Sequence, residues 1–303
     1  LEPRLSLSRI LPYGLRAKAS YSMMHQYVHK ISSSQIASPS DLWVPVTRDL
    51  RPMSAHQWSL GAGYNRIHGW EFGAEAFLKE MYNVIDIIDG ASFFGNSKAW
   101  ESKVTSGRGR SYGVELYASK SVGRTTGSVN YTLAKSDRWF SNGLINSGLS
   151  FPYRYDRRHV VHLQLQHQLT DHIDLNATWN YASGSLVTLA KQQTEYLEPG
   201  NTPLAGDYYS GRNNYRMKPS HQLDLSVNIH HPTRHGERIW NFSLINAYCH
   251  LNQDMVYATM KTEQQVVGTA PDGQPIVERK ERCILKQLTV IPILPSFTYT
   301  YKF

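Results

Sequence analysis

Apolar and polar residues alternate along most of this chain, with the period of two that is typical of β-strands. In the segment 15–23, Leu15, Ala17, Ala19, Tyr21 and Met23 fall on one side, and Arg16, Lys18, Ser20 and Ser22 on the other. The same pattern recurs at 57–64, 70–76, 112–119, 128–134, 161–169, 173–181, 222–229, 240–244 and 295–303. The spacing of an amphipathic helix does not recur. The pattern predicts an all-β, antiparallel fold of about twelve strands.

The connections between these segments alternate in length. Short connections are expected near 12–14, 65–69, 121–125, 169–172, 231–236 and 291–295, and long ones over 30–55, 84–108, 136–152, 185–216 and 250–280. Strands of about ten residues joined in this way are typical of a transmembrane β-barrel, whose short turns face the periplasm and whose long loops face outside. We therefore expect a segment of such a barrel.

A soluble antiparallel sandwich also alternates, and the mean hydropathy of −0.45 would suit one. A membrane barrel gives a similar average, because lipid-facing and lumen-facing residues alternate. Large aromatic residues favour the barrel, since they stand on the apolar sides near expected strand ends, as interface girdles require: Trp58, Trp70, Tyr112, Trp179, Tyr181 and Trp240.

The alternation also predicts which way individual side chains point. Those expected to face lipid are Trp58, Leu60, Tyr112, Leu116, Leu163, Trp179 and Leu225. Those expected to face the lumen are Glu75, Glu115, Gln164, Asn176 and Asp224.

Both ends of the chain fall inside strand-like patterns. The start, LEPRLSLSRI, has no initiator Met and no signal peptide, so we interpret the chain as a piece of a longer protein. The end, PSFTYTYKF, alternates up to Phe303, as expected for a last strand that pairs within a closed barrel. On its own, this piece should form an open sheet with unpaired edges.

Several ordered motifs resemble TonB-dependent outer-membrane receptors of the Bacteroidetes type. They are SSQIASPSDLWVPVTRDLRP (33–52), NVIDIIDGASFF (83–94), KVTSGRGRSYGVELYASKS (103–121), FPYRYDRRH (151–159), HQLDLSVNI (221–229) and the terminal IPILPSFTYTYKF. The resemblance implies a barrel of about 22 strands with an N-terminal plug domain inside it. Residues 1–303 would be the C-terminal part of that barrel, without the plug and the first strands.

The resemblance also implies partners and a location. The expected location is the outer membrane of a Gram-negative bacterium, and the expected energy source is the TonB–ExbB–ExbD system acting through the N-terminal part. Tyr299, Tyr301 and Phe303 resemble the signal that the outer-membrane assembly machinery reads. Lipid, lipopolysaccharide, a small nutrient ligand and a surface lipoprotein are further expected partners.

Two charged clusters are candidate sites. FPYRYDRRH brings together Arg154, Asp156, Arg157, Arg158 and His159, which fit a ligand-binding or plug-facing cluster but fit better a structural network in which Asp156 pairs with a neighbouring arginine. His230, His231 and His235 cluster on a short periplasmic turn, where a metal site is not favoured.

Other classes of function are not expected. The sequence shows no nucleophile-and-base motif or dinucleotide fingerprint, so we expect no enzyme, no cofactor and no metal. The closely spaced glycines of GRGRSYG open a strand rather than a phosphate loop. The net charge is +8, but Lys and Arg are scattered, so nucleic acid is not an expected partner.

The long loops offer the candidate substrate contacts. They are Trp139 and Phe140 in 138–148, and Tyr196, Tyr208, Tyr209, Arg212 and Tyr215 in 194–218. Aromatic and arginine side chains suit stacking on a sugar, a siderophore or a corrin, and equally suit packing between loops.

The two cysteines, Cys249 and Cys283, are expected near the base of the loop 250–280, on two consecutive strands. A disulfide between them and two unpaired thiols are both compatible with the pattern. Periplasmic folding favours oxidation.

The sequence therefore predicts a transporter that imports a scarce nutrient such as an iron-siderophore, haem, cobalamin or glycan. The alternatives are a passive pore or adhesion-type barrel, and a soluble β-rich binding protein.

Overall fold

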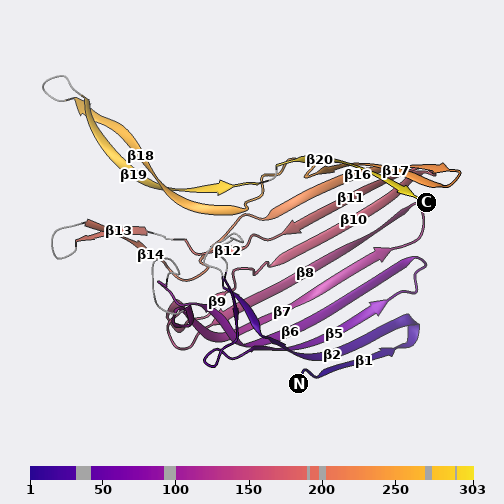
Figure 1. Cartoon of the computed structure of the whole chain (residues 1–303), viewed down its shortest axis with the longest axis horizontal. Helices are drawn as coiled ribbons and strands as arrows, with labels where there is room; N and C mark the ends of the chain where they lie inside the picture. The colour runs from indigo at the N-terminus through magenta and orange to yellow at the C-terminus, as the bar shows by residue number, and fades with distance from the viewer. Residues whose placement is uncertain (32–41, 92–99, 190–191, 198–202, 270–274, 291) are drawn as a thin grey trace.

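The computed structural model describes residues 1–31, 42–91, 100–189, 192–197, 203–269, 275–290 and 292–303. Its main element is an antiparallel sheet in the order β1-β2-β5-β6-β7-β8-β10-β11-β16-β17-β20, with β9 (Phe151–Pro152) paired to β8 as a twelfth strand (Figure 1). The bounds along the sheet are β1 Arg4–Ile10, β2 Leu15–Gln26, β5 Met53–Tyr64, β6 Trp70–Ile87, β7 Val104–Lys120, β8 Thr125–Trp139, β10 His159–Thr170, β11 Ile173–Ala182, β16 Ser220–Thr233, β17 Gly236–Ile245 and β20 Leu294–Lys302. The all-β, antiparallel prediction is confirmed.

The connections do alternate in length. The tight turns 11–14, 65–69, 121–124, 171–172 and 234–235 lie at one end of the sheet, on the right of Figure 1. The opposite end carries the long connections, which in the described residues hold two 3₁₀ turns, Trp100–Lys103 and Asn146–Gly148, and four small two-stranded sheets. A further 3₁₀ turn, Pro12–Gly14, lies in the first tight turn. These are β3 (Val28–Ile31) with β4 (Leu42–Pro45), β12 (Leu186–Val187) with β15 (Tyr215–Arg216), β13 (Gln192–Leu197) with β14 (Pro203–Tyr208), and β18 (Met255–Thr269) with β19 (Pro275–Leu288).

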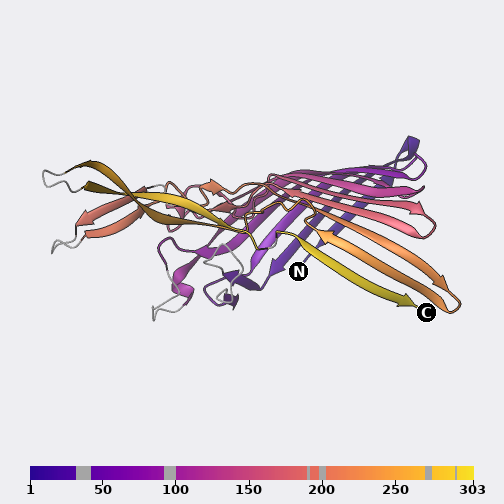
Figure 2. The same cartoon turned by 90° about the horizontal axis from the view of Figure 1, so that it is seen from above.

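The last long connection differs from the sequence prediction. The segment 291–295 is not a tight turn between two strands of the sheet, because β19 pairs only with β18 and β20 pairs directly with β17. The sequence correctly placed Cys283 on a strand, but that strand, β19, is not a member of the sheet. Alternation cannot distinguish a strand of the sheet from one arm of a hairpin, since both have the same period. Figure 2 shows this hairpin extending past the end of the curved sheet.

Cross-strand pairing confirms the predicted faces. Trp58 pairs with Leu78 and Leu78 with Tyr112, while Leu163 pairs with Trp179, so these side chains share one face. Gln164 pairs with Thr178 and Thr178 with Asp224 on the other face. The apolar face is open: Leu60 is 67% exposed and Leu225 42%. A soluble sandwich would cover such a face, so this arrangement requires lipid or another apolar partner.

The buried apolar residues lie mainly in the long connections and at the strand ends beside them. Three small clusters form there: Ile31, Val44, Leu50, Ile87 and Val104; Phe140, Ile145 and Phe151; and Val187, Met217 and Val256. The loops therefore form compact structure of their own at one end of the sheet. In the described residues no helix is long and apolar enough to cross a membrane.

The sheet is open, as expected for this piece. Its path begins at β1 and ends at β20, and among the described strands neither has a partner on its outer side. Inside a bilayer each unpaired backbone group would cost several kcal/mol, so both edges would need pairing partners there.

A β-bulge at Asn83 changes which side chains face inward at the loop end of β6. Tyr82 pairs with Arg108 but Val84 pairs with Gly107, and Asn83 adopts a left-handed conformation with φ 56°. Its side-chain amide donates to the Pro52 carbonyl at 3.1 Å. Even-numbered residues before the bulge point outward, whereas Asp86 after it points to the inner face.

We predict that Leu165→Lys destabilises the membrane-inserted protein by about 2–4 kcal/mol, because Leu165 is 44% exposed in the middle of the apolar face. The matched control, Gln164→Lys on the opposite face, should change stability by no more than about 0.5 kcal/mol. Urea titration of the protein folded into vesicles measures both. Equal losses would show that the apolar face does not contact lipid.

We also predict that Asn83→Gly costs about 1 kcal/mol, through loss of the hydrogen bond to Pro52. Asn83→Val should cost at least about 1–2 kcal/mol more, because a β-branched residue is strained at positive φ. The same titration compares them. Equal costs for Gly and Val would mean that the bulge conformation does not matter.

Candidate functional site

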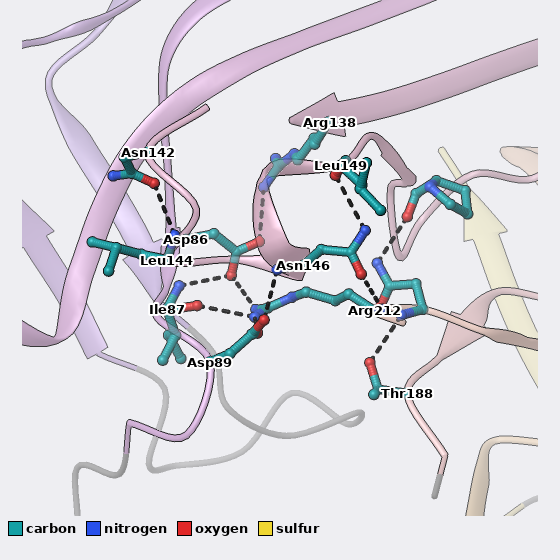
Figure 3. Close-up of polar contacts among 12 residues, drawn as sticks. Asp86, Ile87, Asp89, Arg138, Asn142, Leu144, Asn146, Leu149, Thr188 and Arg212 are labelled. Carbon is teal, nitrogen blue, oxygen red and sulfur yellow. Dashed lines mark hydrogen bonds and ion pairs between the residues drawn. The ribbon is translucent and has the colours of Figure 1, made fainter. Parts of the chain in front are cut away.

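Arg212 ties together the long connections on the inner side of the loop end (Figure 3). Its Nη2 donates to Asp86 Oδ1 at 2.7 Å, and its Nη1 donates to Asp89 Oδ1 at 2.7 Å and to the Ile87 carbonyl at 3.0 Å. Arginine suits this position because its planar fork contacts several acceptors at once. The segment after β6 and the segment before β16 are thereby joined, although more than 120 residues separate them.

Asn146 adds the connection after β8 to this cluster. Its backbone N–H donates to Asp89 Oδ2 at 2.6 Å, and its side-chain Oδ1 accepts from the Arg212 N–H at 2.8 Å. Its φ of 50° is one that asparagine tolerates better than most residues. The neighbouring Asn213 donates from Nδ2 to the Pro152 carbonyl at 2.8 Å and from its backbone to Thr188 Oγ1 at 2.9 Å. Three connections, those after β6, after β8 and after β11, therefore meet at Arg212 and Asn213.

Arg138 approaches Asp86 from the side opposite Arg212. Its Nη1 lies 3.5 Å from Asp86 Oδ2, and its guanidinium lies over the Tyr153 ring at 3.6 Å. Asp86 thus lies between two arginines. We call Asp86, Asp89, Arg138, Asn146 and Arg212 the loop-end cluster.

A cavity of ≈ 640 Å³ borders this cluster. Its lining combines carboxylates, an arginine pair and aromatic side chains, namely Asp86, Asp89, Asn146, Tyr153, Arg154, Tyr209, Arg212 and Asn213 among others. Such a surface can hold a polar ligand the size of a small molecule. Among the described residues, no group of three or more His, Cys, Asp or Glu side chains is placed to hold a metal ion.

Asp156 forms the structural network that the sequence favoured. It is 2% exposed, accepts the Ser136 N–H at 2.7 Å and contacts Arg216 Nη2 at 2.5 Å, with Arg158 at 3.6 Å. Its main partner, Arg216, is distant in sequence, whereas Arg158 is the expected neighbour. At the opposite end of the sheet, His230 contacts Asp174 at 2.9 Å and Glu237 at 2.8 Å.

Of the candidate substrate contacts, Tyr209 and Arg212 line the cavity. Phe140 does not, because it is fully buried against Ile145 and Phe151, which corrects its assignment to the ligand surface. Trp139 pairs with Arg108 on the outward face. Tyr215 packs against the cluster around Val187. Tyr196 and Tyr208 belong to the β13–β14 hairpin, and their side chains lie outside the described residues.

The sequence did not single out Asp86, Asp89, Arg138 or Asn146. Simple alternation places Asp86 on the outward face with Trp70 and Phe72, and only the bulge at Asn83 brings it inward. The available signal was the polar pair inside the apolar run VIDIIDG, which is unusual for a strand that faces lipid.

Of the two states that the sequence left open for the cysteines, the structure has no disulfide at Cys249. Cys249 is exposed and free. The backbone of Cys283 pairs with Met260 inside the β18–β19 hairpin, five residues beyond the Met255–Leu288 pair at its base. The two cysteines are therefore not on strands that face each other. The side chain of Cys283 lies outside the described residues.

The last strand has the expected aromatic face. Tyr299 pairs with Trp240 with ring centroids 5.0 Å apart, and Phe297 pairs with Phe242 at 5.2 Å. Tyr301 is 40% exposed and Phe303 is fully exposed at the chain end.

Known structures share this architecture. The ferric-catecholate import receptor Fiu from E. coli K12 matches with a TM-score of 0.53 at 13% identity, over 98% of this chain and 34% of that one. The ferripyoverdine receptor of the outer membrane of Pseudomonas aeruginosa matches with a TM-score of 0.54 at 10% identity, over 99% of this chain and 33% of that one. The ferric yersiniabactin uptake receptor FyuA from Yersinia pestis matches with a TM-score of 0.56 at 12% identity, over 99% of this chain and 37% of that one. The chain thus spans about a third of these proteins. No curated protein matches.

A protein family described as TonB dependent receptor-like, beta-barrel, matches residues 3–247, which is most of the chain. Both this family and the similar structures are receptors and transporters of the outer membrane rather than enzymes, in agreement with the sequence analysis. The chain therefore belongs to the TonB-dependent receptor β-barrel family of the outer membrane.

Proposed function

We propose that this chain is the C-terminal barrel wall of a transporter that imports a scarce nutrient across the outer membrane. The observation that carries the proposal is the ≈ 640 Å³ cavity at the loop end, bordered by a cluster that joins three connections. Such a site lies where a ligand arriving from outside would first meet the inner side of the barrel. Iron-siderophore, haem, cobalamin and glycan are the candidate nutrients.

The proposal includes the partners that the family resemblance implies. The TonB–ExbB–ExbD system would supply energy through an N-terminal part, and a surface lipoprotein would assist capture. The outward face supports contact with lipopolysaccharide at the loop end. There its apolar band gives way to the pairs Arg110–Glu80 at 2.8 Å and Lys135–Asp137 at 2.9 Å.

Uptake by cells carrying the full-length protein tests the proposal. Under limitation for each candidate nutrient, uptake of one of them should require this protein and should stop when a proton uncoupler is added. Uptake that persists with the uncoupler would indicate a passive pore instead. If uptake of none of these nutrients required the protein, the proposal of import would be contradicted.

We predict that Arg212→Met raises the half-saturating nutrient concentration about tenfold or more. Arg212 acts as a positioning residue, because loss of its charged hydrogen bonds releases loops that would otherwise be preorganised for binding. The matched control is Arg110→Met, which also breaks an arginine–carboxylate pair, but on the outward face. Unchanged half-saturation in Arg212→Met, at normal surface levels, would exclude this cluster from binding.

For the last strand we predict a change in the surface level of the protein rather than in uptake by each molecule. Removing Phe303 should lower the amount of protein in the outer membrane while leaving uptake per assembled molecule unchanged, because Tyr299, Tyr301 and Phe303 would serve assembly. Surface labelling and uptake, measured on the same cells, separate the two quantities. Normal surface levels without Phe303 would contradict this role.

A further inference from the structure

A second, smaller cavity of ≈ 210 Å³ adjoins the loop-end cluster. It lies between β3 and the loop ends of β6 and β8, and Gln26, His29, Lys30, Asp86, Arg138 and Arg154 provide its most polar lining. It shares Asp86, Tyr153 and Arg154 with the larger cavity. A ligand in the larger cavity could therefore extend one group into the smaller one.

Two residues that line the small cavity each carry a buried nitrogen with no hydrogen-bond partner. In the described part of the chain four buried side-chain polar atoms are unpartnered, and His29 Nε2 and Arg138 Nε are two of them. His29 is 5% exposed. Buried polar groups are nearly always hydrogen-bonded, and each unsatisfied one is unfavourable. Two of them on residues that line one small cavity indicate a missing partner there.

The charge of the lining indicates the sign of that partner. Arg138, Lys30 and Arg154 are basic, whereas Asp86 is the one acidic side chain among the lining residues that the structure describes. Asp86 is held by Arg212 at 2.7 Å and lies 3.5 Å from Arg138, so it satisfies Arg138 only weakly. Burial lowers the pKa of the His29 imidazole, which favours the neutral ring. A neutral imidazole can carry its proton on Nε2 and donate from there.

We propose that the small cavity binds one oxyanion group, a carboxylate or a phosphate, of a soluble small ligand. Arg138 Nε–H and His29 Nε2–H are the donors, and the rest of the ligand occupies the ≈ 640 Å³ cavity. Charge-assisted hydrogen bonds of this type are the strong ones. The inference rests on the proposed function in one respect, since it takes the anionic group to be part of the imported nutrient.

Citrate and inorganic phosphate are suitable probes for calorimetric titration of the purified full-length protein, with ionic strength held constant by chloride. We expect both to bind, and Arg138→Met to raise the Kd about tenfold or more. The matched control is Arg108→Met, which removes an arginine that also lies over a tyrosine ring, at 5.4 Å from Tyr82, but on the outward face. The Kd of this control should stay within a factor of two of wild type.

His29 provides a second pair of variants in case Arg138→Met does not assemble. His29→Leu removes the donor and should weaken binding about tenfold, whereas His29→Gln keeps an N–H donor at a similar place and should retain most of the affinity. Equal affinities for Leu and Gln would overturn the role of His29. Absence of citrate and phosphate binding by the wild-type protein would overturn the inference as a whole.

A third experiment distinguishes a soluble anion from the phosphate of a lipid. If only lipopolysaccharide in detergent micelles bound, and binding depended on Arg138, the anion would be a lipid phosphate and the soluble-ligand inference would be wrong. Energy-dependent uptake without anion binding would overturn this inference alone. Anion binding without energy-dependent uptake would support it and contradict the proposed function.

Discussion

The pairing of backbone groups between antiparallel neighbours is the constraint on which the whole structure depends. A strand in a bilayer has no water to bind its backbone N–H and C=O groups. Each of these groups must therefore pair with one on a neighbouring strand. Ten consecutive pairings satisfy this along the path from β1 to β20. The same constraint assigns all irregular structure to the two ends of the sheet. It also means that the outer sides of β1 and β20 would need pairing partners in a bilayer.

Once the strand pairing is fixed, the two faces of the sheet differ in polarity and its two ends differ in the length of their connections. The outward face is apolar and aromatic, and the inward face is polar, because side chains alternate across a pleated strand. The loop end bears its own small apolar clusters, such as Phe140 with Ile145 and Phe151, which give the long connections a defined shape. Arg212 and Asp86 then join those connections by charge. The site is therefore built by loops that are already folded, on the rim of a rigid sheet.

The sequence predicted those parts of the structure that depend on local periodicity. The strands, their faces, and the alternation of tight turns with long loops all follow from a period of two. It failed where one residue breaks the period, as Asn83 does when it turns Asp86 inward. It also failed where the alternation does not specify which strand pairs with which, as for β19, which pairs with β18 outside the main sheet. Among loop residues, composition identified Arg212 and Tyr209 but could not tell them from the buried Phe140, since burial depends on contacts between connections.

The central claim is that this sheet separates lipid from a polar interior. Its most direct test is a fluorescent label placed singly at positions 163, 164, 165 and 166 of the full-length protein in vesicles, in a background without Cys249 and Cys283. Brominated lipid should quench the label at 163 and 165, and a water-soluble quencher should reach it at 164 and 166. Quenching that does not alternate between the two sets of positions would contradict the account.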